Sequence, residues 1–183
     1  MAEITLSNYR EWLPFAIIAF GVFLAMISPF MPHRREHHQK AMKKVAGFRG
    51  ALQPHDLEHW KELYRGTGDK IDPPRGHYID SEGKPTRLDA MWTAGGEDHT
   101  SIQRIAESLE KLCAEFPLDA YEARIVWYEV GQLMDSMHDW LQQIQGVQEG
   151  STFLEEQYPK MREIFVKFGS KFKRWPHRIY AKR

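Results

Sequence analysis

The chain has little of what most catalytic sites need. It contains one cysteine, Cys113, in 183 residues, which excludes an internal disulfide and redox chemistry at a cysteine pair. A reducing compartment is the simpler environment, although a cysteine-poor periplasmic domain would look the same. The glycine-rich phosphate loop, the dinucleotide-binding G-x-G-x-x-G and the hydrolase G-x-S-x-G are all missing. We therefore expect a protein that is not an enzyme and that holds no cofactor.

Neither sign of charge dominates the chain as a whole, but positive charge is concentrated towards its two ends. The formal net charge is zero, but the segment 33–49 has six Lys or Arg against the single acid Glu36. The segment 160–183 has nine Lys or Arg against the single acid Glu163. Because the two basic ends flank an acidic middle, the isoelectric point predicts little about partners.

Charge is also missing from the whole of the segment Leu13–Met31. At a rise of about 1.5 Å per residue, a helix of this length reaches about the 30 Å thickness of a hydrocarbon core. We predict a single transmembrane helix over 13–31, after a short extracytoplasmic N-terminus over 1–12. The Lys and Arg residues that follow place the C-terminal domain in the cytoplasm, at a plasma or inner membrane.

Side chains around this segment fit membrane roles. Trp12 stands at the outer boundary, where amphipathic rings favour the interface. Small residues at helical spacing would allow a second transmembrane helix to approach closely, namely Gly21, Ala25 and Ser28. Basic residues just after the span are predicted to contact anionic lipid headgroups, namely Arg34, Arg35, Lys40, Lys43 and Lys44.

Beyond the span, the hydrophobic periodicity predicts an all-α fold. A basic juxtamembrane region with a short helix occupies 32–66. Apolar residues at spacings of three and four mark three helices in 97–176, which indicates a small antiparallel bundle. In the third of these helices, the apolar residues continue at this spacing as far as Trp175. A basic tail over 177–183 could track nucleic acid or a lipid surface, or simply extend the outer face of the last helix. The chain has no nucleic-acid-binding signature, so nucleic acid is not an expected partner.

Residues 67–96 are rich in Gly, Pro and Asp and show no sustained alternation. A loop of this length is unusual inside a compact domain. It nevertheless carries apolar side chains that a flexible linker would not need, among them Ile71, Tyr78 and Trp92. We therefore predict a long irregular arm that contacts a partner protein through these three residues.

One short motif suggests metal chemistry. His55, Glu58 and His59 form an H-x-x-E-H string on a predicted helix, where two histidines four residues apart share a face. The histidines would bind zinc and Glu58 would activate a water molecule. Such a site needs a third protein ligand, which the sequence pattern does not identify. A surface helix with these residues facing water is the favoured interpretation.

These features predict a single-pass membrane protein. Its cytoplasmic helical domain would bind and stabilise other protein subunits, as an accessory or scaffold subunit of a larger membrane complex. Two other functions remain open on the sequence alone. One is a membrane-tethered zinc hydrolase that uses the H-x-x-E-H string. The other is a holin-like protein that permeabilises the membrane.

Overall fold

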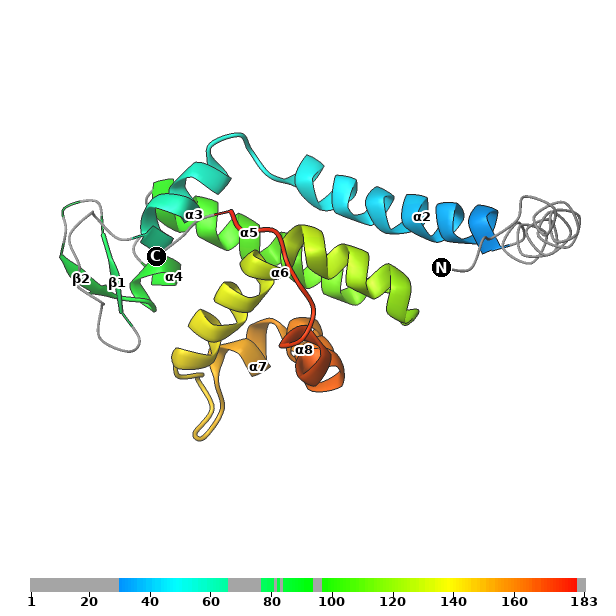
Figure 1. The fold of residues 1–183 in the computed structure, drawn as a ribbon. Helices are drawn as coiled ribbons and strands as arrows, with labels where there is room; N and C mark the ends of the chain where they lie inside the picture. The colour runs from blue at the N-terminus through cyan, green and yellow to red at the C-terminus, as the bar shows by residue number, and fades with distance from the viewer. Residues whose placement is uncertain (1–29, 66–76, 81, 83, 94–96, 181–183) are drawn as a thin grey trace, which may run out of the picture. The chain divides into compact units, whose positions relative to one another are not determined.

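The computed structural model describes residues 30–65, 77–80, 82, 84–93 and 97–180 (Figure 1). The chain forms two compact units, Met1–Lys40 and Ala41–Arg183. The described residues are mostly helical, as the sequence predicts. Almost all of the predicted span lies outside the described residues, as do Trp12, Gly21, Ala25 and Ser28. Among the helices that are described, none combines the length and the apolar character that crossing a membrane requires.

Helix α2 (Phe30–Ala51) begins in the first unit and ends in the second. In the first unit its side chains Arg34, Arg35 and Lys40 are exposed, and Lys40 pairs with Glu36 one turn away at 2.7 Å. In the second unit α2 buries Ala41, Val45 and Phe48 in the hydrophobic core, at the spacing that places three side chains on one helical face.

The second unit contains most of the helices of the described chain. These are α3 (Asp56–Arg65), α4 (Ala90–Thr93), α5 (Glu97–Ala114), α6 (Ala120–Gln143), α7 (Phe153–Gln157) and α8 (Pro159–Phe172). The predicted third helix of the bundle is divided in two, because Pro159 lacks the N–H that would continue α7 and instead begins α8. Cys113 is buried in the core. Desolvation there raises the pKa of its thiol far above the ordinary value.

The segment 67–96 differs from the irregular arm that the sequence predicts. Strands β1 (His77–Ile79) and β2 (Pro85–Arg87) pair antiparallel in the described part of this segment, and α4 follows them. The Asp80 carboxylate closes the turn by accepting hydrogen bonds from the backbone N–H groups of Glu82 and Lys84, at 3.0 and 2.9 Å. Strands of three residues are too short to show alternation, so this short hairpin is an addition to a fold that is otherwise mostly helical, as predicted.

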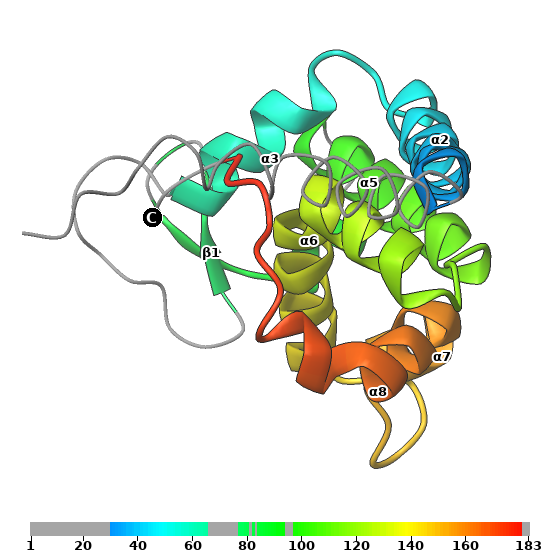
Figure 2. The ribbon, with the colours of Figure 1, turned by 45° about the vertical axis from the view of Figure 1, so that its right-hand side comes forward.

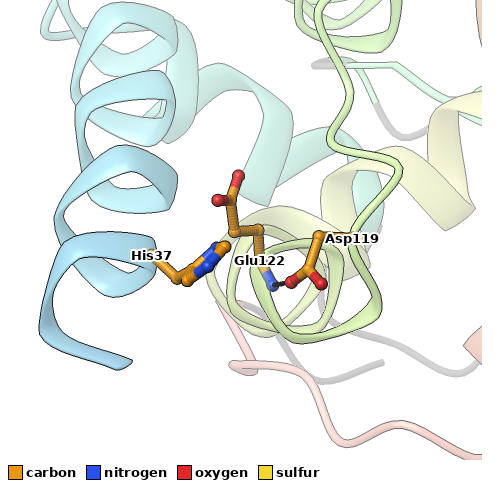
Figure 3. A group of neighbouring side chains, drawn as sticks. All are labelled: His37, Asp119 and Glu122. Atoms are coloured by element: carbon orange, nitrogen blue, oxygen red, sulfur yellow. Dashed lines mark hydrogen bonds between the residues drawn. The ribbon is translucent and has the colours of Figure 1, made fainter. Parts of the chain in front are cut away.

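Carboxylates also cap the helices of the second unit. Asp119 accepts from the N–H groups of Tyr121 and Glu122, both at 3.0 Å, and so caps the beginning of α6 (Figure 3, which also draws His37 of the first unit). Helix α8 has no side-chain cap of its own. Instead, Glu110 of α5 accepts from the first two free N–H groups of α8, those of Lys160 and Met161, both at 2.8 Å. This bidentate contact orients α8 against α5.

A buried carboxylate joins α3 to α5. The Asp56 side chain is fully buried and accepts hydrogen bonds from Gln53 N–H at 2.7 Å and from the Arg104 guanidinium at 2.6 Å. Burial by itself would raise the pKa of Asp56. The hydrogen bonds from Gln53, Arg104 and Ser101 outweigh burial, and the pKa lies below its ordinary value of 3.8.

Replacing Asp56 tests this contact. Asp56→Asn leaves the guanidinium of Arg104 without its counter-ion, and we expect the free energy of unfolding to fall by about 3 kcal/mol at neutral pH. The contribution of Asp56 is present above the unfolded pKa and is lost as the pH falls through the lower folded pKa. Urea unfolding at several pH values should therefore show the two proteins converging in acid.

The matched control for this measurement is Glu58→Gln. Glu58 lies on the same helix but is exposed, so this substitution should change the free energy of unfolding by less than about 0.5 kcal/mol. Equal stabilities of the Asp56 and Glu58 variants would contradict a structural role for Asp56.

Candidate functional site

A groove with a volume of about 770 Å³ opens between α6, α8 and the residues that follow α8. We call it the α6–α8 groove. Its aromatic lining includes Trp140, Phe165, Phe172 and Trp175. Its volume lies within the range of about 300–1,000 Å³ that is typical of ligand pockets. The lining is mixed, because polar side chains from α6 and the C-terminal segment stand beside the aromatic rings.

Stacked rings make the aromatic wall rigid. Trp127 of α6 lies flat against Phe172 of α8, with ring centroids 3.8 Å apart and planes inclined by 4°. His138 stacks on Phe165 in the same way, at 3.9 Å and 13°. The indole N–H of Trp127 donates to the backbone carbonyl of Trp175 at 3.3 Å. These contacts bind both helices and the following segment to one another.

The C-terminal segment 173–180 forms one side of the groove and then passes over α6 (Figures 1 and 2). Arg178 N–H donates to the carbonyl of Tyr128 at 2.6 Å, and the Tyr180 hydroxyl donates to the carbonyl of Glu129. Arg49 of α2 donates to the Tyr180 hydroxyl at 3.0 Å and to the Glu129 carboxylate at 2.6 Å. The described part of the basic tail is therefore held by the protein's own helices.

The polar lining of the groove comes from α6 and from the segment after α8. Asp135, His138 and Asp139 lie on α6, and Lys173 and His177 lie on the C-terminal segment. Partial burial raises the pKa of Asp135, and the neighbouring Asp139 raises it further, against the opposing effects of His177 and Lys173. Burial lowers the pKa of His138, which favours a neutral imidazole. The groove thus places the Asp135 carboxylate on the same wall as the half-buried ring of His138.

The residues of the predicted arm serve the fold of the second unit. Tyr78 and Trp92 are half-buried and pack against its core. The Trp92 indole N–H donates to the Tyr158 hydroxyl at 3.2 Å, and its ring lies 5.6 Å from that of Phe153. Ile71 lies outside the described residues. Partner binding by this segment stays a prediction, and a Trp92→Ala variant would also disturb the core.

The second residue of the H-x-x-E-H string, Asp56, has a structural role, because it is buried and bound by Arg104. His55 precedes the first residue of α3, and its ring centroid is 5.3 Å from that of His59. His59 Nδ1 hydrogen-bonds with Ser101 Oγ at 3.0 Å, while Glu58 is exposed. Within the described part of the chain, no group of three close metal-ligating side chains includes either histidine. The zinc site stays a prediction.

The five predicted lipid-contacting residues do not share one environment. In the first unit Arg34, Arg35 and Lys40 are exposed, and in the second unit Lys43 is exposed as well. Lys44 is half-buried and donates to the backbone carbonyl of Glu115 at 2.5 Å. Its ammonium group therefore contacts the end of α5, and the lipid role of all five residues stays a prediction.

No protein-family model, curated protein or solved structure matches this chain. Sequence reasoning missed the groove, although Asp135, His138 and Asp139 stand at the i, i+3, i+4 spacing that places polar side chains on one helical face. The same spacing is typical of a helix face that simply contacts water. Only the position of α8 beside α6 shows that these side chains line a groove.

Gly131 allows the close approach of Trp127 and the C-terminal segment. A Cβ atom at Gly131 would lie 2.8 Å from two Trp127 ring atoms and 3.0 Å from His177 Cβ. We expect Gly131→Ala to lower the free energy of unfolding by about 1–2 kcal/mol, because overpacking exceeds the gain in helix propensity. Urea unfolding measures the change.

Gly169 of α8 also lines the groove and provides the control for this prediction. A Cβ atom there has nothing within 4 Å. Gly169→Ala should therefore raise the free energy of unfolding by about 0.5–1 kcal/mol through helix propensity. If Gly131→Ala were equally stabilising, the close packing around Gly131 would be refuted.

Proposed function

We propose that this protein is a membrane-anchored accessory subunit whose helical unit binds and stabilises a partner protein through the α6–α8 groove. The observation that carries this proposal is the groove itself. It is a hollow of about 770 Å³ whose walls combine stacked aromatic rings with polar side chains. Hollows of this kind receive the anchoring side chains of a partner in protein–protein interfaces.

The construction of the groove supports binding by a preformed surface. Its walls are held by ring stacking between α6 and α8 and by the hydrogen bonds of the C-terminal segment. Side chains that are already ordered lose little conformational entropy when a partner binds. More of the contact energy is then available for affinity.

The membrane part of the proposal rests on the charge-free segment 13–31 and the basic residues that follow it. A span there would leave the N-terminus outside and the helical unit in the cytoplasm. Exposure of Arg34, Arg35 and Lys43 agrees with contact to anionic headgroups, each contributing about 1 kcal/mol near a membrane surface.

The proposal is tested on the full chain extracted gently from its own membranes. We expect native mass measurement to find it in a larger assembly at a fixed stoichiometry, with mass spectrometry identifying the partner subunit. Recovery of the chain alone would refute an accessory role. Stoichiometric zinc in that material would then favour the hydrolase, and leakage of the membrane on expression would favour the holin-like function.

A groove-filling variant tests which surface the partner uses. Gly169→Leu places a branched side chain in open space on the groove wall, and we expect the partner to be lost from the purified assembly. Gly47→Leu is the matched control, because Gly47 lies in α2, away from the groove lining, and also has nothing within 4 Å of a Cβ atom. Retention of the partner by the Gly169 variant would refute binding through the groove.

A further inference from the structure

Exposed apolar side chains gather on α6 and beside it, away from the groove. Among the described residues, six large apolar side chains are exposed, and four of them lie in this region. Their exposed fractions are 70% for Leu118, 43% for Tyr121, 48% for Tyr128 and 59% for Ile179. The two tyrosines are seven positions apart, and so share one face of α6. Contiguous apolar surface of this kind marks a contact with a protein or a membrane.

The other two residues of this group adjoin the same helix face. Leu118 precedes α6 by two positions, at the corner where α5 ends and α6 begins. Ile179 follows Arg178, whose backbone N–H donates to the carbonyl of Tyr128 at 2.6 Å. The four apolar residues therefore occupy one continuous part of the second unit.

Two arginine side chains stand among these apolar residues. Arg124 lies between the tyrosines on the same face of α6, is exposed and forms no ion pair with any described residue. Arg178 is exposed as well, with its guanidinium 3.6 Å from the Glu129 carboxylate. We call these six residues the corner surface, namely Leu118, Tyr121, Arg124, Tyr128, Arg178 and Ile179.

Most carboxylates that border the corner surface are already engaged. Glu129 pairs with a guanidinium of α2 at 2.6 Å, and Asp119 accepts hydrogen bonds from the N–H groups that begin α6. Glu122 is buried. Glu115 is exposed at the border, where the Lys44 ammonium bonds to its backbone carbonyl at 2.5 Å. The corner surface itself is thus positive and complements anionic phosphate groups.

The length of the chain places the corner within reach of a membrane anchor. Helix α2 enters the second unit at Ala41, and Lys44 contacts the backbone of Glu115 near the end of α5. The charge-free segment ends at Met31, ten positions before Ala41. Ten residues reach about 15 Å as a helix and at most about 35 Å when extended. A span over 13–31 would therefore keep Leu118 near the headgroups.

The composition of the corner surface suits a bilayer. Tyrosine rings favour the headgroup level, where one end of the ring is apolar and the hydroxyl is wet. Aliphatic side chains such as Leu118 reach the acyl boundary, and guanidinium groups pair with lipid phosphates. Tyrosine and arginine are also frequent in protein interfaces. The short connection to the anchor favours the bilayer over a protein.

We propose that the corner surface lies against the bilayer, with Tyr121 and Tyr128 at the headgroup level and Arg124 and Arg178 on lipid phosphates. This inference rests on the membrane anchor of the proposed function and adds a second membrane contact to it. The helical unit then has a fixed orientation towards the membrane, which a single flexible connection would not give.

The experiment measures depth with a spin label on the full chain, reconstituted in vesicles of phosphatidylcholine and phosphatidylglycerol. The label is attached to Leu118→Cys or, as a control, to Val147→Cys. Val147 is 91% exposed and follows the opposite end of α6, about 36 Å away along the helix. Cys113 is buried and should not react, which labelling of the unchanged chain verifies.

We expect the Leu118 label to collide preferentially with oxygen, which concentrates in the bilayer. The Val147 label should collide preferentially with a water-soluble nickel chelate. Equal, water-like accessibility at the two positions would overturn the proposal.

Two substitutions on the corner surface test which side chains make the contact. Tyr121→Glu together with Tyr128→Glu should abolish the oxygen preference of the Leu118 label, because two carboxylates would enter an anionic headgroup layer. Val147→Glu together with Val166→Glu changes two exposed apolar side chains outside the corner surface and should leave that preference intact. An unchanged preference in the tyrosine variant would contradict contact through this face.

The outcomes separate this inference from the proposed function. A water-exposed Leu118 label on a chain that keeps its partner protein refutes the inference alone. Spin–spin broadening between Leu118 labels of two copies would assign the surface to a second copy and overturn it too. Loss of the partner in the tyrosine variant, with the Leu118 label in water, would assign the surface to that protein. Removal of the chain from vesicles by an alkaline wash would instead refute the anchor of the proposed function.

Discussion

The parallel stack of Trp127 on Phe172 is the contact on which the second unit most depends. It joins the middle of α6 to the end of α8, and Phe172 also meets Phe116, which follows α5, edge to face at 6.0 Å. Aromatic pairs contribute about 0.5–1.5 kcal/mol beyond the area that they bury. The Trp127 N–H is satisfied by the carbonyl of Trp175, so the ring is buried without leaving a donor unpaired. Gly131 provides the space that this arrangement requires.

Charged contacts between residues far apart in the sequence determine how the helices are oriented. Glu110 of α5 caps α8, fifty residues later, and Asp56 binds Arg104 between α3 and α5. Hydrophobic burial is non-directional, whereas hydrogen bonds to helix ends and guanidinium groups require particular orientations. These contacts therefore select one arrangement of helices among the many that would bury the same apolar area.

The groove follows from these constraints. Helices α6 and α8 and the C-terminal segment line it, and this segment is then fastened to Glu129 and Arg49 through Tyr180.

The sequence by itself determined the helical character of α5, α6 and α8, because periodic apolar residues report the face that each helix must bury. Only the tertiary structure decided the short hairpin, the structural use of the H-x-x-E-H segment and the groove around Asp135. Each depends on which distant element covers a given face, and periodicity contains no information about that.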